Sequence, residues 1–159
     1  MEYKTLFENI EGFEIFSLTA ICFFIPMLLS NQLVIGILVN TSLAFAAYRI
    51  KMNQAFPLII APALGALCGG IIFGGATLLL VYMIPFIWLS NFIFVKLVNR
   101  YKIISVVIAP VVKSAFLFVS AFTLFSAGLI PSQFLILMGP MQLLTGIFGV
   151  SIGTGISRL

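Results

Sequence analysis

The chain has 159 residues, of which 62% are hydrophobic, and its mean hydropathy is +1.27. Soluble domains contain about 45–50% apolar residues, so this composition predicts an all-α integral membrane protein. The chain has no His, and its four acidic residues are Glu within the first fourteen positions. These absences exclude His-ligated zinc or haem, His-activated nucleophiles and intramembrane carboxylate relays. We therefore expect no cofactor and no resident metal.

Residues 1–14 differ from the rest of the chain. Their apolar residues recur at helical spacing opposite Glu8 and Glu11, and Thr5-x-x-Glu8 has the form of a capping box. We expect a short amphipathic helix on the cytoplasmic surface, acting either as an interfacial anchor or as a docking element for a partner. Residues 15–159 are predicted to form one transmembrane domain.

Six apolar stretches are long enough to cross a bilayer, for which about 17–25 residues are needed. They cover residues 13–30, 33–50, 55–73, 77–97, 103–126 and 133–156. Short breaks separate them at 30–32, 51–54, 74–76, 99–102 and 127–132. No break has room for a folded extramembrane domain. The predicted fold is a six-helix transmembrane bundle in the cell membrane.

Basic residues predict the orientation of this bundle. Residues 1–14 carry one Lys and four Glu, a net charge of −3, whereas residues 15–159 carry seven basic residues and no acid, a net charge of +7. Six of the seven lie at alternate ends of the stretches, which the positive-inside rule assigns to the cytoplasm together with both termini. They are Arg49, Lys51, Lys96, Arg100, Lys102 and Arg158. The net positive charge is therefore a topology signal, and we expect no nucleic-acid partner.

Lys113 is the basic residue that fits neither end. It lies about eleven residues into the fifth stretch, which at 1.5 Å per residue is near mid-membrane. No acidic residue in the membrane can pair with it. It is either a counter-ion for the anionic group of a bound small molecule, or it snorkels to an interface or bonds carbonyls freed by Pro110.

Prolines interrupt five of the six stretches, and broken helices commonly line midplane binding sites. The prolines are Pro26, Pro57, Pro62, Pro85, Pro110 and Pro140. The predicted substrate-binding residues are the polar side chains on these and neighbouring stretches, namely Lys113, Asn91, Gln142, Ser114 and Asn40. The alternative role of the amides is hydrogen bonding between helices. A catalytic Ser-Lys pair is disfavoured because adjacent residues point to different helix faces, so we do not expect an enzyme.

Glycines recur at the four-residue spacing that allows helices to approach closely. The pattern occurs as Gly65-x-x-x-Gly69, Gly70-x-x-x-Gly74 and Gly149-x-x-x-Gly153. These seams serve packing either within the bundle or against a separate membrane subunit. Cys22 and Cys68 lack motif spacing and are interpreted as small apolar residues.

Three ordered motifs occupy the later stretches. They are Tyr82-Met-Ile-Pro-Phe-Ile-Trp-Leu-Ser-Asn91, Ala109-Pro-Val-Val-Lys-Ser-Ala-Phe-Leu-Phe118 and Met141-Gln-Leu-Leu-Thr-Gly-Ile-Phe-Gly149. Together with six short spans and two cytoplasmic termini, this pattern resembles the substrate-binding S component of an energy-coupling factor (ECF) transporter, over roughly residues 55–159. The resemblance implies a vitamin- or micronutrient-binding subunit that docks onto a transmembrane coupling protein and two cytoplasmic ATPases. It also implies a ligand held near the outer face by Asn91, Lys113 and Gln142.

The residues agree with a passive subunit on a separate ground. The chain has no Walker A sequence and no intramembrane acid, so a transporter of this composition needs a partner to drive it. The alternative function is a non-catalytic structural or assembly subunit of a larger membrane complex.

Overall fold

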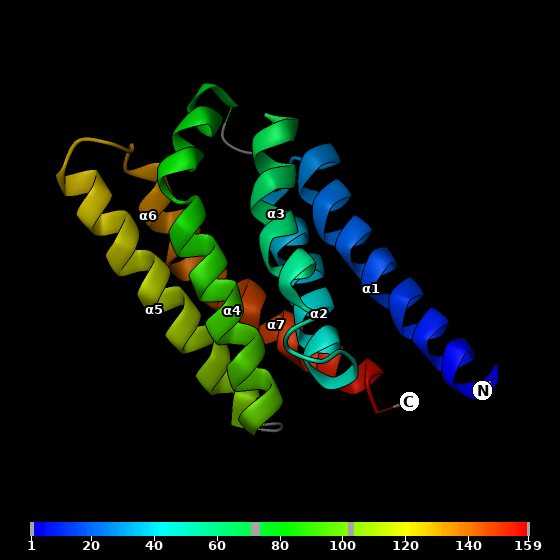
Figure 1. Ribbon diagram of the computed structural model, residues 1–159. Coiled ribbons are helices and arrows are strands. Elements are labelled where there is room, and N and C mark those ends of the chain that lie inside the picture. Colours follow the sequence, from blue (N-terminus) through cyan, green and yellow to red (C-terminus); the bar gives the residue numbers. More distant parts are fainter. Residues whose placement is uncertain (1, 71–73, 102–103, 159) are drawn as a thin grey trace.

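The computed structural model describes residues 2–70, 74–101 and 104–158, with side chains from residue 12 onward. In that part of the chain the secondary structure is helical and includes no strand. The helices stand side by side as an up-and-down bundle with both chain ends on one side (Figure 1). In chain order they are α1 (Glu2–Leu28), α2 (Gln32–Arg49), α3 (Phe56–Gly69), the 3₁₀ helix η1 (Gly74–Tyr82), α4 (Ile84–Tyr101), α5 (Ser105–Ser126), α6 (Gln133–Met138) and α7 (Pro140–Ile156).

Within the described residues, three helical stretches are long and apolar enough to cross a membrane, and a fourth qualifies if η1 and α4 count as one span. The three are α2, α5 and the stretch Gln133–Ile156, which joins α6 to α7. The apolar helices Gly12–Leu28 and Phe56–Gly69 are shorter, with 17 and 14 residues. At 1.5 Å per residue the latter reaches only about 21 Å, less than the ~30 Å of a bilayer core.

The N-terminal segment and the first predicted span form a single helix. α1 runs for 27 residues from Glu2 to Leu28 with no break near residue 14. Of the side chains behind the prediction of an amphipathic face, Phe13 is described and is exposed, whereas the others precede residue 12 and lie outside the described residues, as does Lys102. At the other end of the segment, Glu14 accepts a 2.8 Å hydrogen bond from the guanidinium of Arg49, the last residue of α2.

The fourth predicted span has a different form from the expected single helix. The prediction of a break at 74–76 is wrong, because these residues open η1, which bends by 73° into α4 at Met83. Pro85 is the second residue of α4. Proline has no N–H to donate and a fixed φ that suits a first helical turn, so the new helix begins there.

The same reasoning divides the six prolines into two groups. Pro57, Pro85 and Pro140 stand in the first turns of α3, α4 and α7. Pro26, Pro62 and Pro110 lie inside α1, α3 and α5. Only the second group removes a hydrogen bond from the interior of a helix, because the first N–H groups of a helix have no intrahelical partner.

Two glycine seams bring helix backbones together within the chain. Gly65 and Gly69 of α3 lie directly against the carbonyls of Phe23 and Met27 in α1. On α7, a Cβ at Gly153 would be 2.8 Å from the Cβ of Ala44, and a Cβ at Gly149 would be 2.5 Å from the Cβ of Asn40 and 2.9 Å from the N of Thr41 in α2. Packing inside the bundle thus accounts for the small size of these four residues.

Gly70 and Gly74 have another environment. No described atom lies within 4 Å of a Cβ built at either position, and their φ angles are +66° and +54°. Gly70 is the left-handed C-cap of α3, and its N–H donates to the carbonyl of Ala66. Glycine fits here because other residues rarely adopt a positive φ.

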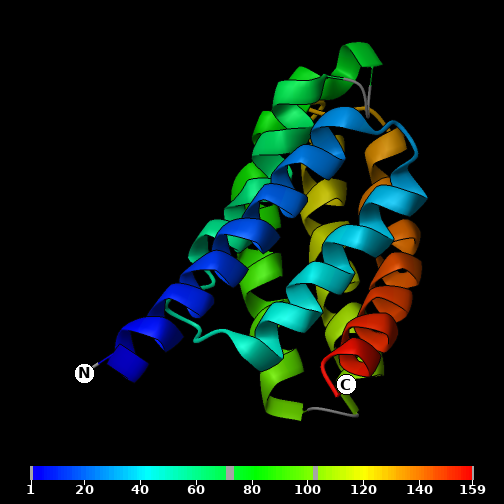
Figure 2. The ribbon, with the colours of Figure 1, turned by 90° about the vertical axis from the view of Figure 1, so that its right-hand side faces the viewer.

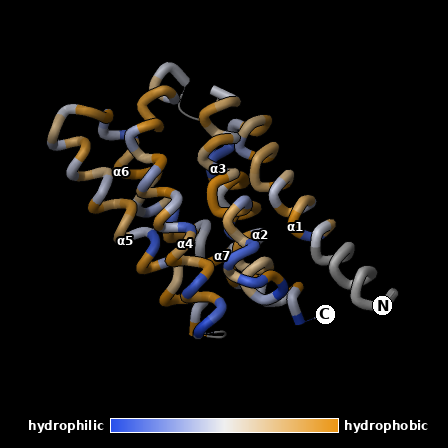
Figure 3. The backbone as a smooth tube through the Cα atoms, viewed as in Figure 1, coloured by the Kyte–Doolittle hydropathy of each residue, from blue (hydrophilic) through white to orange (hydrophobic). Residues whose placement is uncertain are grey.

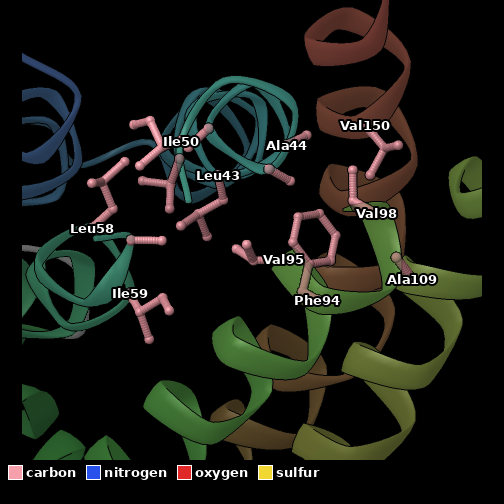
Figure 4. Packing of buried hydrophobic residues seen from close by; sticks show 14 of the residues in the cluster. Leu43, Ala44, Ile50, Leu58, Ile59, Phe94, Val95, Val98, Ala109 and Val150 are labelled. Atoms are coloured by element: carbon pink, nitrogen blue, oxygen red, sulfur yellow. The ribbon is translucent and has the colours of Figure 1, made fainter. Parts of the chain in front are cut away.

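Two hydrophobic clusters occupy opposite ends of the bundle. The terminus-side core lies near the chain ends and is centred on Leu43, Leu58, Phe94 and Val98, all with 0% exposure. Figure 4 shows Phe94 reaching from α4 into the space beside Ala44 of α2 and Val150 of α7. The far-side core collects Ala66, Leu80, Met83, Leu117, Ala121, Ile130, Phe134 and Met138.

Hydrophilic residues concentrate at the end of the bundle that carries the termini (Figure 3). The second view shows that the α2–α3 connection turns at this same end, where α4 also ends and α5 begins (Figure 2). Four of the basic residues therefore share one end, namely Arg49, Lys51, Arg100 and Arg158.

Candidate ligand-binding site

A cavity lies between the two cores, in the half of the bundle away from the termini. Its volume is about 70 Å³. One water needs about 10–15 Å³ on this measure, so the cavity has room for roughly five waters or a ligand with a similar number of heavy atoms. Five polar side chains line it, Gln32, Asn40, Asn91, Lys113 and Gln142.

The remaining wall of the cavity is apolar. The helix-interior prolines Pro26 and Pro62 line it together with Ala63. Further apolar side chains come from both cores, including Ile35, Val39, Ala66, Leu80, Leu117 and Met138. A mainly apolar wall with a few convergent polar groups is the usual form of a small-molecule site.

Lys113 is the charged group of this cavity. Its side chain is 3% exposed, and its Nζ donates a 2.7 Å hydrogen bond to Oδ1 of Asn40. The Nζ also lies 4.8 Å from the centre of the Phe94 ring, where an ammonium is attracted to the face of the π system. Among the described side chains the only carboxylate is that of Glu14, which pairs with Arg49. Lys113 therefore has no counter-charge in the described part of the chain.

Asn40 is held in place from the opposite side. Its Nδ2 donates to Oγ1 of Thr145 at 3.2 Å, and this hydroxyl donates to the carbonyl of Met141 at 2.8 Å. Asn40 and Thr145 are each 1% exposed. Because a lysine ammonium only donates, the pairing fixes which amide atom of Asn40 faces Lys113. The chain of bonds joins α5, α2 and α7 at the cavity.

Asn91 contributes a second amide, from α4. Its Nδ2 donates a 3.0 Å hydrogen bond to the carbonyl of Ile59 in α3, and the side chain is 2% exposed. Gln142 of α7 is half-buried, and no hydrogen bond joins its side chain to a described residue. Both amides therefore keep hydrogen-bonding capacity beside the cavity.

Four of the five predicted substrate-binding residues thus line one cavity, and Ser114 does not. The Ser114 hydroxyl donates to the carbonyl of Val111 one turn earlier in α5. This back-bonding satisfies the hydroxyl locally, because Ser competes for helix carbonyls three or four residues before it.

Three residues of the site were not among those predicted. Gln32 lines the cavity, and its Oε1 is buried without a partner among the described residues. The signal for its position was present in Asn31, whose side chain accepts from the N–H groups of Leu33 and Val34 and so makes Gln32 the first helical residue. Thr145 is a polar residue of the sixth apolar stretch and so was available to line a site, whereas Phe94 has no comparable sequence signal, since its role depends on which helices meet.

Comparison with protein-family models, with curated proteins and with solved structures finds no match to this chain. Within the described residues, no group of three or more His, Cys, Asp or Glu side chains is placed to hold a metal ion.

Proposed function

We propose that the protein is a membrane-embedded binding subunit for a small anionic molecule, and that Lys113 is the counter-ion for this ligand. The observation that carries the proposal is the position of the Lys113 ammonium, which is buried at a cavity wall without a carboxylate partner. A lone charge at membrane depth costs about 2.5–3.5 kcal/mol on insertion scales. A bound anion would offset this cost, and the neighbouring amides would orient it.

The proposed topology has six spans, with both termini in the cytoplasm. Six helical rods support it when η1 with α4 and α6 with α7 are each taken as one broken span. The basic residues Arg49, Lys51, Arg100 and Arg158 share the end of the bundle that carries the termini, which the positive-inside rule makes cytoplasmic. The cavity would then lie in the outer half of the membrane, where it would receive ligand from outside the cell.

We further propose that the subunit feeds an ATP-driven uptake system of the ECF type, as its resemblance to S components implies. Within such a system, a vitamin-like or micronutrient anion would be the substrate. A transmembrane coupling protein and cytoplasmic ATPases would supply the driving force. The composition supports a driven subunit, since the chain has neither a P-loop nor an acid after Glu14.

The first test is binding by the purified protein. Mass spectrometry of small molecules released on denaturation should detect an anion, and Lys113→Met should remove it. Loss of a hydrogen bond to a charged group costs about 1.5–3 kcal/mol, so affinity should fall roughly ten- to hundredfold. Lys96→Met is the matched control, because Lys96 is an exposed lysine of α4 outside the cavity.

The outcome against the proposal is equally defined. Unchanged affinity in Lys113→Met would remove Lys113 from the site. Recovery of a stable membrane complex without an ATPase, together with no ligand in the purified protein, would favour the structural or assembly subunit instead.

A further inference from the structure

One wall of the cavity presents a hydrogen-bond acceptor with no partner. Asn91 lines the cavity and is 2% exposed. Its Nδ2 is engaged by the Ile59 carbonyl at 3.0 Å, whereas its Oδ1 accepts no hydrogen bond from a described residue. A carbonyl only accepts, so the amide cannot be turned around without placing oxygen against oxygen. The free group of Asn91 is therefore an acceptor, which a donor on a ligand in the cavity can satisfy.

The Asn91 acceptor and the Lys113 ammonium belong to side chains that line the same cavity. Phe94, whose ring centre is 4.8 Å from Nζ, follows Asn91 by three positions in α4. Residues at this spacing are neighbours on one helix face, with Cβ atoms about 5–6 Å apart. Of the three donors on the ammonium, one is engaged by Asn40, which leaves two for a ligand. A cationic donor and a neutral acceptor thus line one cavity of about 70 Å³, which a ligand of a few heavy atoms can span.

From this pairing we infer that the ligand is a small hydroxycarboxylate, with its carboxylate at Lys113 and a nearby hydroxyl donating to Oδ1 of Asn91. The inference rests on the proposed function, in which Lys113 binds the anionic group. The hydroxyl satisfies the acceptor that a plain carboxylate leaves unpaired. The cavity volume of 70 Å³ corresponds to about five waters at 10–15 Å³ each, which suits an anion of five or six heavy atoms.

An amino group fits this position less well than a hydroxyl. An α-ammonium would also donate to Asn91, but it would stand close to the Lys113 ammonium. The cavity lining contains no carboxylate to balance the two cations. Like charges this close repel strongly where water is scarce. The site should therefore distinguish two acids of the same shape that differ only in this group.

The experiment is a calorimetric titration that measures the affinity of three probes for the full-length protein in lipid nanodiscs. Lactate and propanoate differ by the hydroxyl, and alanine has the shape of lactate with an ammonium in its place. Lactate should bind about tenfold more tightly than propanoate, since its hydroxyl adds a hydrogen bond to Asn91 that the plain acid lacks. Alanine should bind more weakly than lactate.

Variants separate the inference from the proposed function. Asn91→Leu should bring the ratio of lactate affinity to propanoate affinity close to one, whereas Lys113→Met should weaken the binding of both acids roughly ten- to hundredfold. Equal affinities for lactate and propanoate in the unaltered protein would overturn the inference while leaving the anion site standing, and this comparison needs no variant to fold. Discrimination that survives in Asn91→Leu would overturn it as well. If neither acid binds the unaltered protein, the anion site itself fails.

Discussion

The two halves of the bundle are built from similar apolar residues but differ in how closely those residues pack. In the terminus-side half, small residues bring α2 and α7 into backbone contact at Gly149 and Gly153, and Phe94 fills the space between the helices. In the far half, the helices enclose a cavity whose wall includes four buried or half-buried polar side chains besides Lys113. Close packing leaves no space for a ligand, whereas a cavity beside a charged group has both the space and the charge to bind one.

The position of Lys113 at the boundary of the two halves explains the division. Its ammonium rests over Phe94 of the terminus-side core and bonds Asn40, whose amide is fixed by Thr145. The terminus-side half therefore holds the charged group in one place, and the far half leaves room for the ligand that the charge binds. Preorganised groups bind better because less ordering is needed at the moment of binding.

The largest expected effect tests the tight seam. Gly149→Ala should destabilise the protein by about 2–3 kcal/mol, the upper range for overpacking, because the new methyl group would meet the backbone of Asn40 and Thr41. Gly155→Ala in the same helix is the control. Nothing lies within 4 Å of its Cβ among the described atoms, so better helix propensity should leave stability equal or slightly higher. Thermal unfolding in one detergent measures both, and equal losses would contradict the description of the seam.

The second prediction places the same substitution in each half. Ala44→Leu adds three carbons to the terminus-side core, where Ala44 is fully buried against Gly153, and should cost about 1–3 kcal/mol. Ala63→Leu adds them at the cavity wall and should be tolerated, but it should abolish ligand binding by filling the space. Unfolding and ligand titration on both variants test this. An Ala63→Leu protein that is as unstable as Ala44→Leu would show that the far half is also closely packed.

A third prediction concerns the charge at the boundary. Asn40→Asp puts a carboxylate of nearly the same shape 2.7 Å from the Lys113 Nζ, which neutralises the cation internally. Anion affinity should fall by at least about tenfold through competition, while the fold is retained. Asn40→Ser is the comparison, because it shortens the side chain without adding charge. If Asn40→Asp binds anions as well as the unaltered protein, the Lys113 charge is not what attracts them.

The smallest expected effect lies at the charged end. Glu14→Gln removes the ion pair with Arg49, whose side chain is 51% exposed. Exposed ion pairs contribute little because water and salt screen them. The unfolding midpoint should be indistinguishable from that of the unaltered protein at 0.5 M salt. A clear loss of stability there would mean that charges, rather than packing, hold the terminus-side half.

Much of the helical framework was predictable from hydropathy and breaks. The connections predicted at 30–32, 51–54 and 127–132 overlap those of the structure, which cover 29–31, 50–55 and 127–132. The bent form of the fourth predicted span, η1 followed by α4, was not predictable, because Gly74-Gly75 is compatible with either a turn or the start of a helix. Likewise, a proline in an apolar stretch can begin a helix, as Pro85 does, or interrupt one, as Pro62 does.

The chemistry of the candidate site was more accessible than its geometry. Lys113, Asn40, Asn91 and Gln142 were predicted because polar side chains in long apolar stretches are few and costly. Ser114 was placed beside them by sequence adjacency, yet its hydroxyl bonds its own helix at Val111. Gln32 was assigned to a break because it follows Ser30 and Asn31, although the N-cap at Asn31 puts it on the cavity-facing side of α2.

The sequence by itself determined that this chain is helical, apolar and acid-free beyond Glu14, since composition and periodicity need no partner helix to be read. It also determined that none of the residues that follow Glu14 could supply a carboxylate side chain to pair with Lys113. Only the tertiary structure decided that Asn40 and Thr145, which are 105 residues apart, meet beside that lysine. It alone left the Asn91 oxygen without a hydrogen-bond donor among the described residues. The physical reason is that hydrogen bonds between helices depend on how the helices pack, and the small residues along each seam set that packing only when the whole bundle is assembled.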